Sequence, residues 1–223
     1  MPNLSRWPLP WPVAAAAIFI LWRRQKFMVA VGIALSFLAY LRPGEMHTLQ
    51  VRSLVPPVDP GSRGATGRWS LVVREQGGPP TKTGTFDDSV ILDRPDVLYL
   101  DKLWRGLKKN RAPHAQLIPI SQLHFASEVK ASFEEVGAQK LNIVAYSLHH
   151  GGASRDFLQR FRDRWRSSTS VLRYQKSTKV LSAMHQLTPR MRDLCKMCGE
   201  QLDSLLEDPS VDPVLPGRAA EPL

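Results

Sequence analysis

Two apolar runs near the start of the chain constrain its fold more than any other feature. Residues 13–22 (VAAAAIFILW) and 27–41 (FMVAVGIALSFLAYL) are separated only by Arg23-Arg24-Gln25-Lys26. A helix that is apolar on most of its faces lies at the centre of a domain or in a membrane. Each run is shorter than the roughly 20 residues needed to cross a bilayer, so we predict two buried core helices. A membrane anchor or hairpin is the alternative.

The rest of the chain predicts a small sheet and further helices. Strand-like runs at 69–74 and 89–92 flank a Gly/Pro turn, which predicts a β-hairpin. Apolar residues at helical spacing recur later, and Ser121 can serve as an N-cap. The predicted helices cover residues 96–107, 121–136, 176–187 and 191–206. The predicted class is α+β, mainly α-helical, with a small antiparallel sheet after the first two helices.

The charge balance favours a polyanionic partner. The 223 residues carry a formal net charge of +10, and such an excess of Lys and Arg favours nucleic acid or an anionic membrane surface. The basic segment Lys108-Lys109-Asn110-Arg111 is interpreted either as a phosphate contact or as a solvated loop.

Cys195 and Cys198 are the only cysteines and stand in a C-x-x-C spacing. This spacing is typical of half a zinc site or of a redox pair, but zinc needs further ligands and only His185 is close. We therefore interpret the pair as two free thiols on a C-terminal helix, which fits a reducing compartment.

The segment 141–176 concentrates side chains that can do chemistry. It reads LNIVAYSLHHGGASRDFLQRFRDRWRSSTSVLRYQK. Tyr146 and His149 are three residues apart, so they share one face if this part is helical. Trp165 follows a helix-like run, and Tyr174 comes nine residues later, after a turn rich in hydroxyl groups. A tyrosine presented in this way can act as a nucleophile.

Two further motifs stand upstream. Arg42 lies in Tyr-Leu-Arg-Pro-Gly-Glu at the end of the second apolar run, and Lys82 lies in Lys-Thr-Gly within the predicted hairpin. The order of these motifs resembles the catalytic domain of tyrosine recombinases (phage integrase-like), in particular those of eukaryotic mobile elements. The resemblance covers about residues 13–185 and implies an integrase-like catalytic domain.

The expected domain organisation follows from this resemblance and from composition. An N-terminal lead (1–12) precedes the catalytic-like domain (13–187), and a C-terminal helix (188–206) precedes a proline-rich, disordered tail (207–223). Members of the family usually carry a separate helical DNA-clamping domain before the catalytic one, and we expect that half of the clamp to be missing from this chain.

The resemblance implies a role for each motif residue. Tyr174 would be the nucleophile that forms a 3′-phosphotyrosyl intermediate, and Arg42 would be the first phosphate clamp. Lys82 would be the general acid, and the Trp165 indole would donate to the phosphate. Tyr146 takes the place of the helical histidine. The expected reaction needs no metal and no small-molecule cofactor.

The resemblance also implies partners and a location. We expect double-stranded DNA as the partner, a homo-oligomer assembled on DNA, and the nucleus as the location. Glu45, in the motif of Arg42, would hold that arginine or the neighbouring helix in place. No membrane partner is expected.

His149 departs from the family pattern, which has an arginine at this position. A neutral imidazole cannot form two parallel bonds to a phosphate, and loss of one preorganised donor costs roughly 10²–10³ in rate. The first alternative is therefore a catalytically inactive DNA-binding relic of a mobile element. The second is a small membrane-associated protein that uses residues 13–41.

Overall fold

The computed structural model describes residues 8–57, 68–74, 88–92, 100–157 and 177–207. The described chain is mainly helical with one small antiparallel sheet, which confirms the predicted α+β class. The helices are α1 (Trp11–Arg23), α2 (Phe27–Leu38), α3 (Pro43–Thr48), α4 (Asp101–Lys108), α5 (Gln122–Glu135), α6 (Ala145–Phe157), α8 (Ser177–Gln186), α9 (Pro189–Glu200) and α10 (Leu202–Glu207), with the short 3-10 turns η1 (Val51–Ser53) and η3 (Gln139–Leu141).

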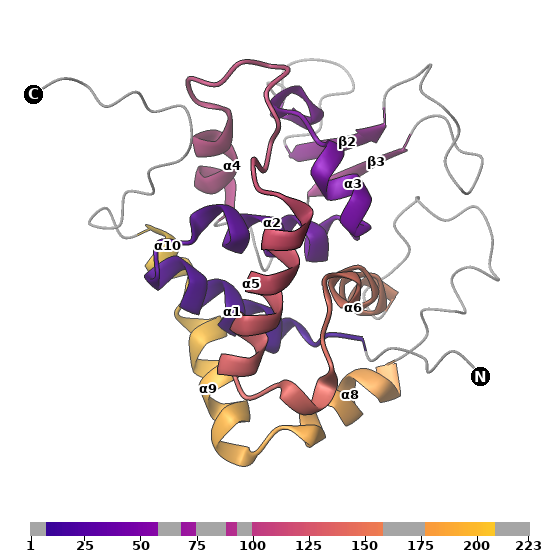
Figure 1. Cartoon of the computed structure of the whole chain (residues 1–223), viewed down its shortest axis with the longest axis vertical. Helices are drawn as coiled ribbons and strands as arrows, with labels where there is room; N and C mark the ends of the chain where they lie inside the picture. Colours follow the sequence, from indigo (N-terminus) through magenta and orange to yellow (C-terminus); the bar gives the residue numbers. More distant parts are fainter. Residues whose placement is uncertain (1–7, 58–67, 75–87, 93–99, 158–176, 208–223) are drawn as a thin grey trace, which may run out of the picture.

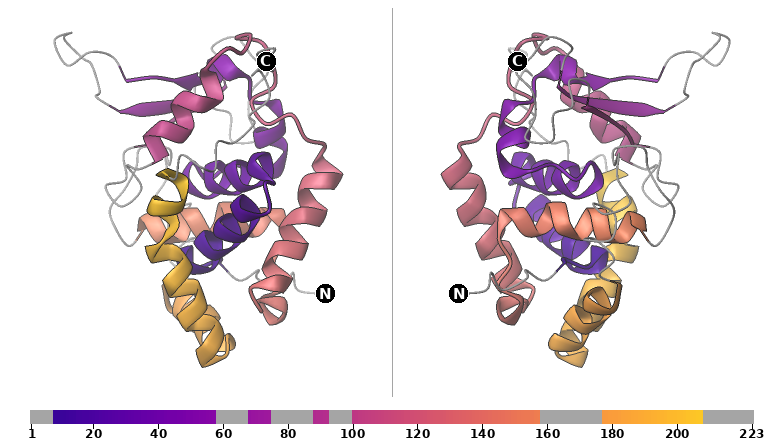
Figure 2. Two further views of the ribbon diagram at one scale, coloured as in Figure 1. Left: turned by 90° about the vertical axis from the view of Figure 1, so that its left-hand side faces the viewer. Right: turned by 90° about the vertical axis from the view of Figure 1, so that its right-hand side faces the viewer.

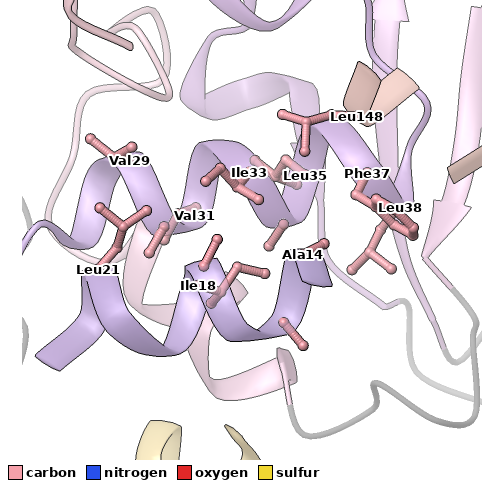
Figure 3. Packing of buried hydrophobic residues seen from close by; sticks show 14 of the residues in the cluster. Ala14, Ile18, Leu21, Val29, Val31, Ile33, Leu35, Phe37, Leu38 and Leu148 are labelled. Carbon is pink, nitrogen blue, oxygen red and sulfur yellow. The ribbon is translucent and has the colours of Figure 1, made fainter. Parts of the chain in front are cut away.

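Helices α1 and α2 form an antiparallel hairpin at the centre of the fold (Figure 1). Every residue of α2 except Met28 is buried, and α1 is buried along most of its length. Side chains such as Ile18 on α1 and Val31 on α2 fill the space between the two helices (Figure 3). The prediction of two buried core helices is confirmed. Within the described ranges, each helix is too short or too polar to pass through a bilayer.

The helix α1 starts earlier than the apolar run predicts. It begins at Trp11, with Pro12 in the first turn, where proline's fixed φ suits a helix start. Leu9, within the predicted N-terminal lead, is only 1% exposed and belongs to the core. The lead therefore packs with the domain from residue 8 onward, and residues 1–7 lie outside the described part.

The basic break between the two central helices is tied to α5. Gln25 adopts a left-handed backbone (φ 58°), which reverses the chain. Arg24 Nη1 lies 2.7 Å from a carboxylate oxygen of Glu135, and Lys26 Nζ lies 2.6 and 2.8 Å from the two oxygens of Glu128. The charges that interrupt the apolar sequence thus dock a third helix onto the hairpin.

The sheet contains β1 (Leu54–Val55), β2 (Trp69–Arg74) and β3 (Asp88–Leu92) in the order β1-β2-β3, with antiparallel pairing throughout. Leu71 pairs with Leu54 on one side and with Val90 on the other, and all three are buried. The predicted hairpin strands are confirmed. The Gly/Pro turn predicted between them lies outside the described residues.

The helical elements surround the central hairpin on several sides. The sheet, α3 and α4 lie at one end of the molecule, and α8 and α9 lie at the other (Figures 1 and 2). Helix α5 begins after Ser121, whose hydroxyl accepts a bond from the His124 N–H, as the sequence predicted. Helix α4 is confirmed from Asp101, and the start of the helix predicted over 96–107 lies outside the described residues.

The predicted C-terminal helix divides into two. Thr188 caps α9 through its hydroxyl, with Pro189 in the first turn, and the chain breaks at Gln201 before α10. Helix α9 packs against α1, and its residues Cys195 and Cys198 belong to the buried core. The tail predicted over 207–223 lies outside the described residues from 208 onward.

Candidate functional site

The structure describes half of the predicted site residues. Lys82, Trp165 and Tyr174 lie outside the described ranges. Arg42 lies at the start of α3, and Tyr146 and His149 lie on α6. The geometry of the site is therefore built from the turn between α2 and α3 and from α6.

Arg42 is held by Glu45 at both its backbone and its side chain. It is the N-cap residue of α3 and has an extended backbone (φ −71°, ψ 151°). The Arg42 backbone N–H donates to Glu45 Oε2 at 2.8 Å, and Arg42 Nη1 donates to Glu45 Oε1 at 3.0 Å. The expectation that Glu45 holds Arg42 is confirmed. The Arg42 side chain remains 34% exposed, so its guanidinium reaches solvent.

The chain reaches Arg42 through an unusual turn at Tyr40. Tyr40 is buried and has a left-handed backbone (φ 50°). This conformation costs a residue other than glycine about 1–2 kcal/mol, so surrounding contacts must hold it. The Leu41 N–H donates to the Ser36 carbonyl at 3.1 Å, which closes the end of α2 around the turn.

His149 contacts this same turn from α6. Its ring Nδ1 hydrogen-bonds to the backbone carbonyl of Tyr40, and the residue is only 6% exposed. A carbonyl oxygen can only accept, so Nδ1 carries the hydrogen and donates it. In the neutral ring, Nε2 then holds the lone pair. This contact joins residues 109 positions apart.

Three aromatic rings gather on α6 around His149. The Tyr146 ring centroid lies 5.4 Å from that of His149 and 4.8 Å from that of His150, and the two histidine rings are 5.5 Å apart. The prediction that Tyr146 and His149 share one helix face is confirmed. Their rings form one cluster beside the turn that leads to Arg42.

Two glycines let α6 approach the end of α2 closely. A Cβ on Gly151 would collide with the Leu9 carbonyl, and one on Gly152 with the Phe37 carbonyl. Only residues without a side chain fit at such an approach. The contact of His149 with Tyr40 was missed by sequence reasoning, and the adjacent Gly-Gly pair was the signal that could have indicated it.

Arg155 is the other basic residue near this part of α6, and it points elsewhere. Its guanidinium carbon lies 4.7 Å from the centroid of the Trp11 ring, a cation–π contact with the start of α1. Arg155 therefore ties α6 to α1.

Two cations of the basic segment 108–111, Lys108 and Arg111, donate hydrogen bonds to the protein's own backbone. Lys108 Nζ donates to the carbonyls of Val51 and Leu54, at 3.2 and 2.5 Å. Burial lowers the pKa of Lys108 and that of Arg111. Arg111 donates to the backbone carbonyls of Leu107, Gln116 and Leu117. Both cations therefore link separate segments of the backbone. Lys109 is exposed.

Both cysteines of the C-x-x-C pair are buried residues of α9, the helix that packs against α1. Burial, and then the neighbouring Cys198, raise the pKa of the Cys195 thiol to about 11. Burial also raises the pKa of Cys198. Both cysteines are free thiols, as the sequence predicted. In the part of the chain that the structure describes, no group of three or more His, Cys, Asp or Glu could hold a metal ion.

The described part of the site thus joins the end of α2, the first turn of α3 and the middle of α6. It offers a partly exposed guanidinium and a cluster of three polar rings, one of which, the buried imidazole of His149, donates to the backbone. Comparisons of the chain with protein-family models, curated proteins and solved structures found no match. The chemistry of this site is therefore inferred from its own residues.

Proposed function

We propose that this protein binds double-stranded DNA and cleaves and rejoins it through a 3′-phosphotyrosyl intermediate, as a recombinase or integrase of the tyrosine type. Tyr174 is the nucleophile and Arg42 clamps the phosphate. Lys82 protonates the leaving 5′ oxygen, and Trp165 donates its indole N–H to the phosphate. Tyr146 acts as a donor or general base. The net charge of +10 suits a polyanionic substrate.

The contact between His149 and Tyr40 is the observation that carries this proposal. The motif of Arg42 and the motif of Tyr146 lie about a hundred residues apart, and each alone is a weak signal. The hydrogen bond from the His149 ring to Tyr40, two residues before Arg42, supports their belonging to one site. The glycines after His149, which allow this approach, support it further.

The order of elements gives independent support. Two buried helices precede Arg42, and a three-stranded antiparallel sheet follows it. Lys82 falls in the sequence between β2 and β3, the hairpin position from which a lysine can supply a proton. Tyr146 and His149 follow on α6.

The test is a suicide-substrate assay. The protein is incubated with nicked, end-labelled duplex DNA, and a denaturant-resistant protein–DNA adduct is sought. We expect an adduct that Tyr174→Phe abolishes, because the phenol oxygen is the only difference between the two side chains. Strand cleavage would be refuted if the wild type and Tyr174→Phe bound the DNA equally well and neither formed an adduct.

A second candidate is a DNA-binding module without catalysis. The observation that favours it is the burial of His149, which donates to a backbone carbonyl and is 6% exposed, where the family has a phosphate-binding arginine. Such a module binds DNA without forming an adduct. In both cases binding weakens steeply with salt, because phosphate neutralisation releases counterions. A flat salt response contradicts both.

A further inference from the structure

We propose that His149 is a positioning residue, which holds the Tyr40 carbonyl and thereby sets the direction in which the chain delivers Arg42. It does not replace the missing arginine as a phosphate ligand. That Arg42 binds phosphate rests on the proposed function. That His149 holds the turn at Tyr40 does not depend on that function.

The turn needs such a hold. Tyr40 is in the left-handed region without being glycine, so the conformation is disfavoured unless other contacts fix it. The Tyr40 carbonyl and the Leu41 N–H belong to one peptide unit, and the Leu41 N–H bond to the Ser36 carbonyl holds the N–H side of that unit. The bond from His149 Nδ1 holds the carbonyl side, so that the peptide unit one residue before Arg42 is held at both of its polar groups.

Arg42 is fixed from the opposite direction by Glu45. That carboxylate accepts both the Arg42 backbone N–H and its Nη1, at 2.8 and 3.0 Å. The arginine is therefore held by α3 after it and, through Tyr40, by α6 before it. A guanidinium held in this way needs little rearrangement when it meets a phosphate.

The location of His149 suits a neutral donor better than a cation. Residue 149 is buried against the end of α2, beside the rings of Tyr146 and His150. A buried charge is costly unless it is paired, and an arginine would lose the bond from Nδ1 to Tyr40. Restoring the family residue with His149→Arg should therefore loosen Arg42. If the chain were only a relic disabled at residue 149, the same substitution should increase activity.

A matched pair of variants tests the inference. The asparagine amide nitrogen occupies the place of Nδ1, whereas the longer glutamine places its amide nitrogen near Nε2. We expect His149→Asn to keep the Tyr40 bond and His149→Gln to lose it. Misplacing Arg42 should slow adduct formation on nicked DNA about 100-fold in the Gln variant, with the Asn variant at least tenfold faster than Gln. His149→Arg should be as slow as Gln.

A spectroscopic readout keeps the test independent of activity. In ¹⁵N-labelled protein, the His149 ring should show the hydrogen on Nδ1, and the Arg42 Nε–H signal should be unchanged by Asn but shifted by Gln. A hydrogen on Nε2, equal Arg42 signals in the two variants, or a faster His149→Arg enzyme overturns the inference. If the wild type forms no adduct, the proposed reaction fails, and the ring and Arg42 signals still decide the role of His149.

Discussion

Gly152 and Phe37 lie so close together that no side chain fits between them. A Cβ built on Gly152 would lie 1.8 Å from the Phe37 carbonyl oxygen and 2.9 Å from a ring carbon of Tyr40. The obstruction is backbone, which cannot rotate away as a side chain can. This approach sets the separation of α6 from the end of α2, and with it the place of the candidate site.

Gly152→Ala should therefore be strongly destabilising. The added methyl group can fit only if α6 moves away from α2, which breaks the packing between the two helices. Overpacking at such a rigid contact costs about 3 kcal/mol or more of folding free energy. Denaturant unfolding followed by circular dichroism measures the loss. Gly199→Ala is the control, because its nearest neighbour, Ala15 Cβ, lies at an ordinary 3.7 Å. That variant should stay within about 1 kcal/mol of wild type; equal losses in both would contradict the packing argument.

The ion pair between Lys26 and Glu128 should stabilise the fold measurably. Glu128 is 16% exposed and accepts at both oxygens, so Glu128→Gln should lower the free energy of unfolding by about 1 kcal/mol. On the same helix, Glu134 lies 3.8 Å from Lys130 and both are largely exposed. Glu134→Gln should change stability by less than about 0.5 kcal/mol. Similar losses in the two variants would show that the contact between α5 and the hairpin contributes no more than an ordinary surface pair.

The carboxylate of Asp101 should make part of the stability depend on pH. Burial would raise its pKa, but hydrogen bonds from Arg105 and the Trp69 indole outweigh burial and hold the pKa below the ordinary value of 3.8. A lowered carboxyl pKa stabilises the folded state above the unfolded pKa. That contribution is lost as pH falls through the folded pKa, in the range below 3.8.

Asp101→Asn tests this linkage because it keeps the shape and removes the charge. The variant should be less stable than wild type at pH 6, and the difference should shrink toward pH 3. Urea unfolding at a series of pH values measures it, and the Trp69 indole N–H signal reports whether α4 still contacts β2. A difference that stays constant with pH would rule out the carboxylate as its source.

The thiols of Cys195 and Cys198 should be unreactive in the folded protein. Only the thiolate reacts quickly, and a pKa of about 11 leaves little thiolate on Cys195 at pH 8. Alkylation by iodoacetamide should therefore follow the rate of unfolding, and should become fast in guanidinium chloride. Rapid alkylation under native conditions would mean that α9 separates from α1 without global unfolding.

Local sequence signals predicted the elements whose causes are local. Ser121 predicted the start of α5 because an N-cap acts within one turn, and the two strand-like runs on either side of a Gly/Pro segment predicted the hairpin. The split at Gln201 was not predicted, because an amphipathic pattern continues across it. Likewise, Lys108 and Arg111 look like surface cations in sequence, and only the fold brings them to backbone carbonyls.

In the candidate site too, the sequence predicted contacts between near neighbours but not those between distant residues. The bond of Glu45 to Arg42 spans three residues and follows from helix geometry, so it could be expected. The contact of His149 with Tyr40 spans 109 residues and depends on how α6 crosses the end of α2. No periodicity or motif encodes that crossing, although the two glycines indicate that something approaches closely.

The packing of α1 against α9 has a consequence for biosynthesis. The hairpin of α1 and α2 leaves the ribosome well before α9, which covers one of its apolar faces. At about 5–20 residues per second, the interval between the two is roughly ten to thirty seconds. During that time the nascent chain exposes an apolar face of this hairpin to solvent. A chaperone that holds such segments during translation is therefore expected to increase the yield of folded protein more than one that acts after chain release.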